Sequence, residues 1–401
     1  MNFKVTFRLR GLGLAGILAL CASAFAQERL ITRLSDPNLA AEVAAAYSIT
    51  LTDSTGPAPF ALYTLPPGVS ADFMQTLMMG DPRIVWAEDD GEAETPETTS
   101  GKGSVANVIG DRNYLAAQNT NLLQQIQFYY PKYRTRRIVR MAILDTGLSP
   151  HVPRLWNKVD ASLNALPDGL PPHDLPQNID TNGNGDVDDG VGHGTMVAGI
   201  VDLLAPLVRY VVVRVADSDG VGNAWSITKG LAFAVVSGAE IANVSLGSIE
   251  RLNALSDVLD WTEANRLLVV SPIGNNGFDQ ALFPGGYSNV VCVSGVNPND
   301  TKAPFSNWAG DADAAAPATG IQSTWWDGRT GIWSGTSFAA PMVASALAEG
   351  LRLGIPRTPE YLRLKAQTSG DSIDSLNPGY VGELGKRLNY RRLVGSMLGR
   401  K

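Results

Sequence analysis

From about residue 139 onward, short apolar runs rich in β-branched residues alternate with stretches of helical length. Near-continuous apolar strands of this kind indicate a parallel sheet that is covered by helices on both faces. We therefore expect an α/β fold with a doubly wound, mostly parallel sheet in residues 111–401. The strands are expected at Val139–Leu144, Val208–Val215, Ile241–Leu246, Leu267–Ser271 and Val290–Val293, and the helices at Thr195–Leu204, Trp225–Val236 and Leu252–Ala264.

A different pattern occupies residues 27–90, where short strands and short helices alternate. Asp36-Pro37 predicts a helix start, with Asp as the N-cap and Pro at the first position, and Ser70 predicts a second N-cap. The order βαββαβ is that of a small ferredoxin-like α+β domain. The strands are expected at Arg29–Leu34, Ile49–Thr52, Phe60–Leu65 and Arg83–Glu88, and the helices from Pro37 to about Tyr47 and at Ala71–Met79.

Residues 91–110 separate these two regions and predict a linker. Acidic residues run from Glu88 to Glu97, and a stretch rich in Thr, Ser and Gly follows over 98–104. A run of like charge beside such residues is typical of a solvated linker.

The first 26 residues have the layout of a secretory signal peptide. Basic residues precede an apolar run over 11–22, and Ala24-Phe25-Ala26 forms a small-x-small cleavage site. The apolar run is shorter than the roughly 20 residues that a membrane span needs. We therefore expect a secreted protein, in the periplasm or outside the cell, with no stable membrane span. The basic residues are Lys4, Arg8 and Arg10.

Composition and charge exclude several classes of protein. With 44% hydrophobic and 18% charged residues, the chain is not largely disordered. Its two cysteines, Cys21 and Cys292, form no CxxC pair, which excludes a disulfide scaffold and a cysteine-ligated zinc site. The net charge is −7 and no segment is strongly basic, which argues against nucleic acid as the main partner. Residues 27–98 hold 12 acidic and 3 basic side chains, so the acidity belongs to the small domain.

Three residues that together support nucleophilic catalysis lie beside predicted strand ends and helix starts. Asp145 follows a predicted strand, His193 precedes a predicted helix, and Ser337 precedes Pro341, which we expect in the first turn of a helix. In acyl transfer a serine attacks, a histidine takes its proton, and an aspartate orients and stabilises the imidazolium. In doubly wound folds the site forms at the carboxyl ends of strands, where these residues are expected.

The same chemistry needs donors for the negative oxygen that develops. Gly274-Asn275 follows a predicted strand and offers an amide side chain, and the N–H groups at the helix start beside Ser337 favour negative charge. Each motif alone has an ordinary structural explanation, such as a turn for Asp145-Thr146-Gly147 or a helix cap for Gly335-Thr336-Ser337. The combination is much more specific than any one motif.

Together these motifs resemble those of the subtilisin-like serine peptidases, or subtilases. Asp145-Thr146-Gly147, Gly192-His193-Gly194-Thr195 and Gly335-Thr336-Ser337 match the three active-site motifs in the family's order Asp, His, Ser. Asn275 matches the family's oxyanion asparagine, and weaker matches extend over about 110–398. The resemblance implies a serine endopeptidase that hydrolyses peptide bonds through an Asp-His-Ser triad and an acyl-enzyme intermediate.

The resemblance also implies a substrate cleft between two glycine-containing segments. Residues 219–222 resemble the segment that pairs with the substrate main chain, and residues 243–247 resemble the opposite wall. A peptide lying between them as an added strand would bind through main-chain hydrogen bonds. The expected substrate-binding residues are Gly220, Val221, Gly222, Ser245, Leu246, Gly247 and Gly274.

The small acidic domain resembles the inhibitor-like N-terminal propeptide of this family. The resemblance implies a latent precursor, or zymogen, whose propeptide inhibits the enzyme until self-cleavage removes it. A permanent accessory domain is the alternative. The chain ends soon after residues 385–389, which resemble the end of the family's catalytic domain, so we expect no C-terminal accessory domain. The expected partners are protein or peptide substrates and the chain's own propeptide.

Several positions depart from the family's usual pattern without removing a catalytic group. Met196 stands in place of a second histidine, Phe338 in place of methionine, and Ala316-Pro317-Ala318 in place of Ala-Pro-Gly. Pro272 and Ile273 replace small residues beside the main specificity pocket. The family's side-chain specificity is therefore not transferred to this chain.

Residues 180–190 place oxygen-bearing side chains at alternate positions. The pattern matches the first half of an EF-hand loop, but Val191 stands where the bidentate Glu would be, so it is not an EF-hand. Because many subtilases carry calcium loops, we expect a structural Ca²⁺ here, with a solvated turn as the alternative. The candidate ligands are Asp180, Asn182, Asn184, Asp186 and Asp188.

Other functions fit the motifs less well. An esterase of the α/β-hydrolase class needs Gly-x-Ser-x-Gly, with Asp between Ser and His, whereas Ala339 occupies the second glycine position here and the order differs. A sedolisin would carry Glu in the histidine's role. The remaining alternative is a catalytically silent, peptidase-like binding protein, although all four catalytic groups are present.

Overall fold

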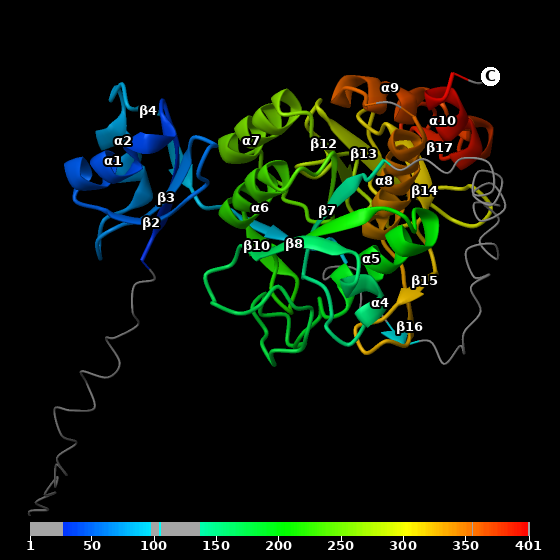
Figure 1. The fold of residues 1–401 in the computed structure, drawn as a ribbon, viewed down its shortest axis with the longest axis horizontal. Coiled ribbons are helices and arrows are strands. Elements are labelled where there is room, and N and C mark those ends of the chain that lie inside the picture. The colour runs from blue at the N-terminus through cyan, green and yellow to red at the C-terminus, as the bar shows by residue number, and fades with distance from the viewer. Residues whose placement is uncertain (1–26, 98–103, 106–136, 355, 400–401) are drawn as a thin grey trace, which may run out of the picture.

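The computed structural model describes residues 27–97, 104–105, 137–354 and 356–399. The predicted signal peptide and much of the predicted linker lie outside these residues. The described chain forms a small domain and a larger α/β domain that lie side by side (Figure 1).

The small domain is an antiparallel sheet of order β2-β3-β1-β4, which is ferredoxin-like as predicted. Both predicted N-caps are confirmed, because Asp36 accepts a hydrogen bond from the Asn38 N–H and Ser70 accepts one from the Phe73 N–H. The elements are β1 (Arg29–Leu34), η1 (Pro37–Leu39), α1 (Ala40–Tyr47), β2 (Thr50–Ser54), β3 (Phe60–Thr64), α2 (Ala71–Met78) and β4 (Ile84–Asp89).

The two faces of this small sheet bury different partners. Leu30 and Leu34 pack beneath α1 and α2 in the core of the small domain. Ile31, which points to the opposite face because side chains alternate along a strand, packs with Phe60 and Leu62 in a core shared with the large domain. The small domain is therefore docked through a buried apolar face.

The large domain is built on an eight-stranded parallel sheet of order β17-β14-β13-β12-β11-β7-β9-β8, which confirms the predicted fold class. Its strands are β7 (Arg140–Asp145), β8 (Val159–Asn164), β9 (Arg209–Arg214), β11 (Ile241–Val244), β12 (Leu268–Pro272), β13 (Val290–Val296), β14 (Ala314–Pro317) and β17 (Lys386–Arg387). Its main helices are α5 (His193–Leu204), α6 (Ala224–Val236), α7 (Asn253–Ala264), α8 (Thr336–Leu353), α9 (Pro359–Thr368) and α10 (Tyr390–Met397).

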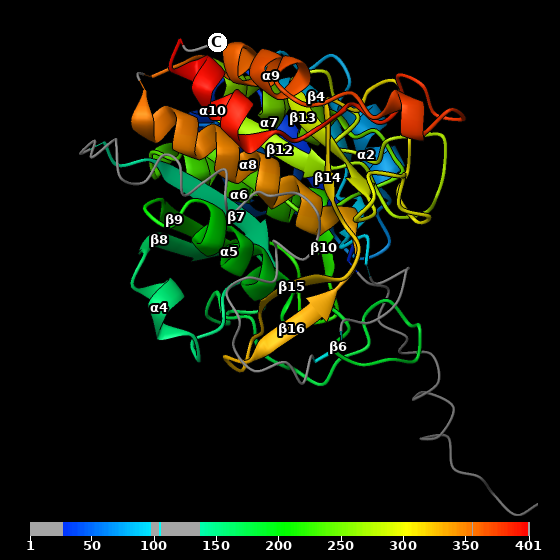
Figure 2. The same ribbon diagram turned by 90° about the vertical axis from the view of Figure 1, so that its right-hand side faces the viewer.

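Helices cover both faces of the large sheet (Figure 2). Along β7, Met141 and Ile143 belong to the core formed with α5, α8 and α10, whereas Ala142 and Leu144 belong to the core formed with α6 and α7. The small domain packs on the α6 and α7 side. Smaller elements complete the domain: β10 (Val221–Asn223), β15 (Ile321–Thr324), β16 (Thr330–Trp333), α4 (Pro153–Trp156) and η3 (Asp374–Leu376).

The expected position of Pro341 in the first helical turn is wrong. Helix α8 already begins at Thr336, so Pro341 lies in its second turn. A proline in a helix interior donates no hydrogen bond to the carbonyl four residues earlier, which here belongs to Ser337. That carbonyl instead accepts a hydrogen bond from Ser245 Oγ at 3.3 Å. The bond from Ser245 satisfies the carbonyl that the proline leaves free, and it joins α8 to a wall of the predicted cleft.

The predicted solvated linker also differs from the structure. Residues Glu92–Glu94 form β5, which pairs with β10 of the large domain, and Ser104–Val105 form β6, which pairs with β16. Thr95, Pro96 and Glu97 are buried. Donors of the large domain bind three carboxylates of the acidic run, those of Glu88, Asp90 and Glu97. In the described part of the chain, no helix combines the length and the apolar character that a membrane crossing requires.

Candidate active site

The loop after β7 and the first turn of α5 bring Asp145 and His193 together. Asp145 Oδ1 lies 2.7 Å from His193 Nδ1, and both side chains are fully buried. Gly147 has φ +108°, and a side chain at Gly194 would collide with the main chain of Gly147. The two glycines thus permit the close approach that the Asp–His pair needs.

Asp174 fixes the start of the helix that carries His193. This buried carboxylate accepts hydrogen bonds from the N–H of Gly192 at 2.8 Å, and from the N–H and Oγ1 of Thr195 at 3.0 and 2.6 Å. Helix starts leave N–H groups without intrahelical partners, and a carboxylate there also interacts favourably with the helix dipole. Burial raises the pKa of Asp174, against the opposing effect of its bonds to Thr195 and Gly192.

Asn275 and the N-terminus of α8 form a pair of hydrogen-bond donors. Asn275 Oδ1 accepts bonds from the N–H and Oγ1 of Thr336, at 2.9 and 2.8 Å. This fixes the orientation of the amide, so that its Nδ2 donor faces the same space as the N–H of Ser337. Such preorganised donors can stabilise an oxyanion. Ser337 Oγ is buried and, within the described residues, has no hydrogen-bond partner.

The side chain of Glu97 occupies the space between these groups. Its Oε1 accepts hydrogen bonds from Asn275 Nδ2 at 2.9 Å and from the Ser337 N–H at 3.3 Å. Its Oε2 lies 3.0 Å from His193 Nε2. Burial acts to lower the pKa of His193, but the carboxylates of Asp145 and Glu97 outweigh it and raise this pKa to about 10. Both ring nitrogens thus face a carboxylate, which favours the charged form of the imidazole.

The segment that leads to Glu97 runs as a strand between the two predicted walls of the cleft. Glu94 exchanges two main-chain hydrogen bonds with Gly247, at 3.1 and 2.8 Å. On the other side β5 pairs antiparallel with β10, and the Thr95 N–H donates to Gly220 O at 2.9 Å. The structure thus brings both glycine-containing segments to one extended peptide. The residues predicted for the two walls are Gly220, Val221, Gly222, Ser245, Leu246 and Gly247. Gly274, the remaining predicted residue, directly precedes Asn275.

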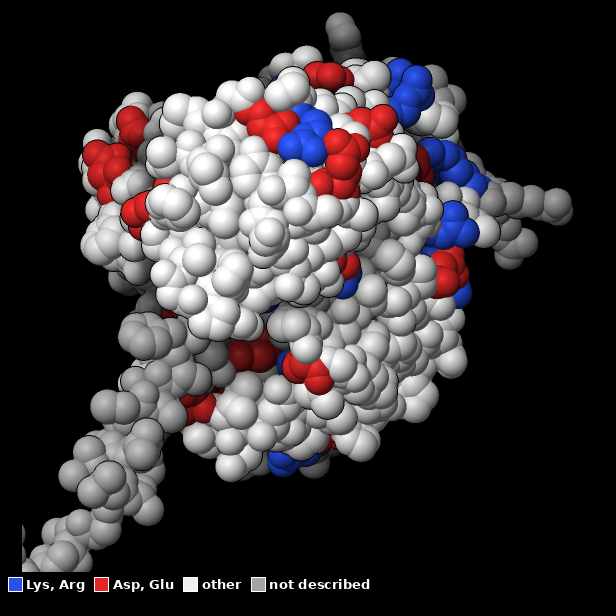
Figure 3. Space-filling model, turned by 90° about the vertical axis from the view of Figure 1, so that its left-hand side faces the viewer, with Lys and Arg blue, Asp and Glu red and all other residues white. Residues whose placement is uncertain are grey.

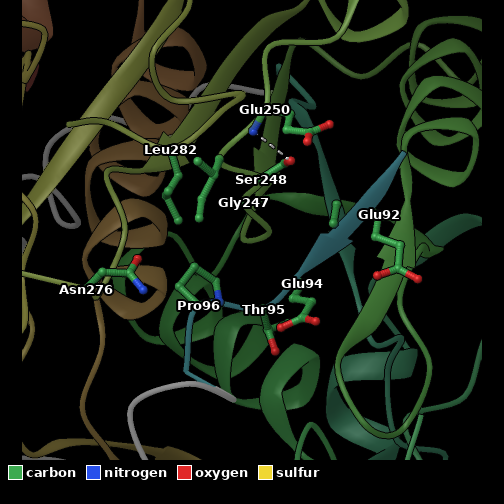
Figure 4. A pocket seen from close by; sticks show the side chains of 11 residues that line it. Glu92, Glu94, Thr95, Pro96, Gly247, Ser248, Glu250, Asn276 and Leu282 are labelled. Atoms are coloured by element: carbon green, nitrogen blue, oxygen red, sulfur yellow. Dashed lines mark hydrogen bonds between the residues drawn. The ribbon is translucent and has the colours of Figure 1, made fainter. Parts of the chain in front are cut away.

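A pocket of about 460 Å³ opens beside this strand (Figure 4). It is lined by residues of the strand, by the segment that follows Gly247, and by Asn276 and Leu282. Glu250 lies at its far side from Asn276, and its N–H bonds to Ser248 Oγ at 3.2 Å.

Acidic side chains of the small domain cap two helices of the large domain. Glu88 accepts bonds from the N–H groups of Asn253 and Ala254 at the start of α7, and Asp90 accepts the Trp225 N–H at the start of α6. Asp53 pairs with Lys229 at 2.6 Å. On the side of the molecule shown in Figure 3, most of the surface is uncharged and acidic side chains form small groups. Part of the small domain's acidity is thus used in docking.

Two of the candidate calcium residues accept hydrogen bonds from the protein itself. Asp188 accepts main-chain N–H bonds from Gln177 and Asn178 and a bond from Ser218 Oγ, and Asp180 accepts the Gly185 N–H. Among the described residues, no group of three or more His, Cys, Asp and Glu side chains is placed to hold a metal ion. Asn182, Asn184 and Asp186 lie in the same loop. This arrangement does not fit one ion held by all five residues, and calcium binding stays a prediction.

Sequence reasoning missed two residues of the site. Glu97 belongs to a charge run that is usually solvated, and the alternation Glu92-Ala93-Glu94 was the one local sign of a strand. Asp174 lies in an irregular loop, and its role depends on contacts with a helix start 18 residues later in the chain.

Phe338, a departure from the family pattern, packs with Trp333 around the His193 ring, at centroid distances of 5.1 and 5.5 Å from it.

Comparisons with known proteins agree with this geometry. Residues 137–360 match the model of the subtilase family, Peptidase_S8. Subtilisin BL of Lederbergia lenta is 33% identical over 219 residues, which are 52% of this chain and 75% of that protein. Alkaline elastase YaB of Bacillus sp. (strain YaB) is 33% identical over the same number of residues, but the match spans only 53% of its length.

Solved structures share the fold over nearly the whole chain. The epidermin leader peptide processing serine protease of Staphylococcus aureus has a TM-score of 0.71 at 18% identity, covering 92% of this chain and 99% of that one. Fervidolysin of Fervidobacterium pennivorans, described as a keratinolytic enzyme related to subtilisin, has a TM-score of 0.72 at 16% identity, covering 93% and 61%. With the matched family model and the 75% coverage of Subtilisin BL, these findings show that the chain belongs to the subtilase family.

Proposed function

We propose that this chain is a secreted serine endopeptidase that is made as a latent, self-processed precursor. The observation that carries the proposal is the extended segment 92–97, which lies between the two cleft walls and ends in a carboxylate bound by Asn275, Ser337 and His193. The site therefore binds a peptide main chain and a negative oxygen at adjoining positions, as peptide-bond hydrolysis requires.

In the proposed reaction Ser337 Oγ attacks the carbonyl carbon of the scissile bond, and its proton passes to His193 Nε2. Asp145, bonded to Nδ1 at 2.7 Å, orients the ring and stabilises the imidazolium. The Asn275 amide and the Ser337 N–H stabilise the oxyanion. His193 then protonates the leaving amine, and water hydrolyses the acyl-enzyme by the same steps in reverse.

The small domain is proposed to be the propeptide. Its buried face, its carboxylates at the starts of α6 and α7, and its C-terminal strand in the cleft all support an inhibitor of the same chain. If the small domain were a permanent accessory domain, its C-terminal strand would have to leave the cleft without being cleaved. The secreted location rests on the predicted signal peptide.

Labelling of Ser337 by a fluorophosphonate separates the peptidase from a silent binding protein. The processed wild-type protein is expected to gain one adduct, and the Ser337→Ala variant none. A processed protein that stays unlabelled would contradict the proposed function and favour the silent alternative.

Calcium binding by the 180–188 loop is a separate proposal. A bound ion stabilises the folded state in proportion to its binding energy. Thermal unfolding of the Ser337→Ala protein, with calcium and with excess chelator, tests it. A higher Tm with calcium supports the site, and equal Tm values would contradict it.

A further inference from the structure

Glu97 contacts the proposed general base, His193, and both proposed oxyanion donors, the Asn275 amide and the Ser337 N–H. Its carboxylate is fully buried and reaches Asn275, the Ser337 N–H and His193 within 3.3 Å. These contacts come from the side chain of an intact chain, not from a cleaved terminus. They differ from the main-chain pairing of Glu94 and Thr95, which any peptide can make.

The surroundings of the carboxylate are shaped to hold it. Gly335 lies directly against the Glu97 side chain, and a Cβ there would displace the carboxylate from its present position. Thr336 fixes the Asn275 amide with its donor toward Glu97. Hydrogen bonds in which one partner is ionised are about twice as strong as neutral ones, and burial strengthens them further.

We infer that Glu97 is the residue that keeps the precursor inactive, by filling the oxyanion site with its carboxylate and holding His193 away from Ser337. This inference rests on the proposed function and names how that site is regulated. While Oε1 takes both oxyanion donors, no substrate carbonyl can use them. While Oε2 pairs with Nε2, the imidazole cannot accept the serine proton. The first cut therefore requires that the Glu97 side chain leaves the site.

The Glu97→Ala variant tests this directly. Asp72→Ala is the matched control, because Asp72 is an exposed acidic residue of α2, outside the segment in the cleft, and its loss changes the net charge equally. Each precursor is exposed briefly to a fluorophosphonate. In the labelling reaction Ser337 Oγ forms a bond to phosphorus, fluoride leaves, and the serine proton passes to His193. Intact mass then distinguishes labelled precursor from labelled processed enzyme.

We expect Glu97→Ala to raise the labelling rate of the precursor roughly 10–100-fold, the range for loss of hydrogen bonds to a charged group. Asp72→Ala should label at the wild-type rate. Glu97→Gln keeps the shape of the side chain but not its charge, and should give a smaller increase. The Gln variant keeps the test decisive if the Ala variant folds poorly.

Equal labelling of wild-type, Gln and Ala precursors, with normal labelling of the processed enzyme, would overturn the inference and leave the proposed function intact. An equal increase in Asp72→Ala would also overturn it, because the effect would then be one of general charge. Absence of labelling in the processed enzyme as well would contradict the proposed function and the inference with it.

Discussion

Hydrogen bonds to Thr336 and Glu97 fix the orientation of the Asn275 amide. Its oxygen is held by Thr336, so its nitrogen is left to donate to Glu97, at the position where we propose that an oxyanion develops. Removing one such donor costs about 10²–10³ in turnover, as found in this same family. We therefore predict that Asn275→Ala lowers kcat by this factor with little change in KM.

Steady-state kinetics on the processed enzyme check this prediction. Asn289→Ala is a suitable control, since Asn289 is bonded to Asp260 at the surface and should keep wild-type kcat. A kcat for Asn275→Ala within about threefold of wild type would contradict the assigned oxyanion role.

The Glu97–His193 pair predicts a pH dependence of precursor stability. The charged groups facing His193 are Asp145 and Glu97, and together they raise its pKa to about 10 from an ordinary value of 6.5. A raised histidine pKa contributes stability that is fully present below about pH 6.5 and is lost as the pH rises through about 10. The Tm advantage of the Ser337→Ala precursor over its Glu97→Gln double variant should therefore shrink between pH 7 and pH 10. An advantage that stays constant over this range would contradict the ion pair.

At the scale of elements, the loop that carries Asp174 positions helix α5. Asp174→Ala would leave N–H groups of Gly192 and Thr195 buried without their acceptor, at a cost of about 1–3 kcal/mol. We expect a loss of stability of this size, and a lower kcat because the helix start carries His193. Asp174→Asn keeps an oxygen acceptor and should lose less.

Urea unfolding of these variants in the Ser337→Ala background measures the stability without self-digestion. A variant Asp174→Ala that is as stable as its parent would show that the carboxylate does not hold the helix start.

The elements themselves could largely be predicted from the sequence, because apolar runs and caps are local signals. The strand β1 and both predicted caps of the small domain agree with the structure. Helix α8 could not be placed correctly from Pro341, since the bond from Ser245 that compensates the proline joins residues 92 apart in the chain. Such long-range compensation leaves no local trace.

At the scale of the whole molecule, the sequence distinguishes a small acidic domain from an α/β domain. It does not predict how the two domains pack against each other. The motifs singled out Asp145, His193, Ser337 and Asn275 as the proposed catalytic residues, because their residue types and order are specific. Glu97 was not predicted as a site residue, because a charge run is solvated unless donors elsewhere bind it. Here those donors are the reaction's own groups, supplied by three separate elements of the large domain.

The central claim is that one chain is both a peptidase and its own temporary inhibitor. The most direct measurement compares the intact masses and casein hydrolysis of wild type and Ser337→Ala. We predict that wild type loses the small domain and digests casein, while Ser337→Ala keeps the small domain and is inert. If wild type also keeps the small domain and is inert, the account of a self-processed peptidase is contradicted.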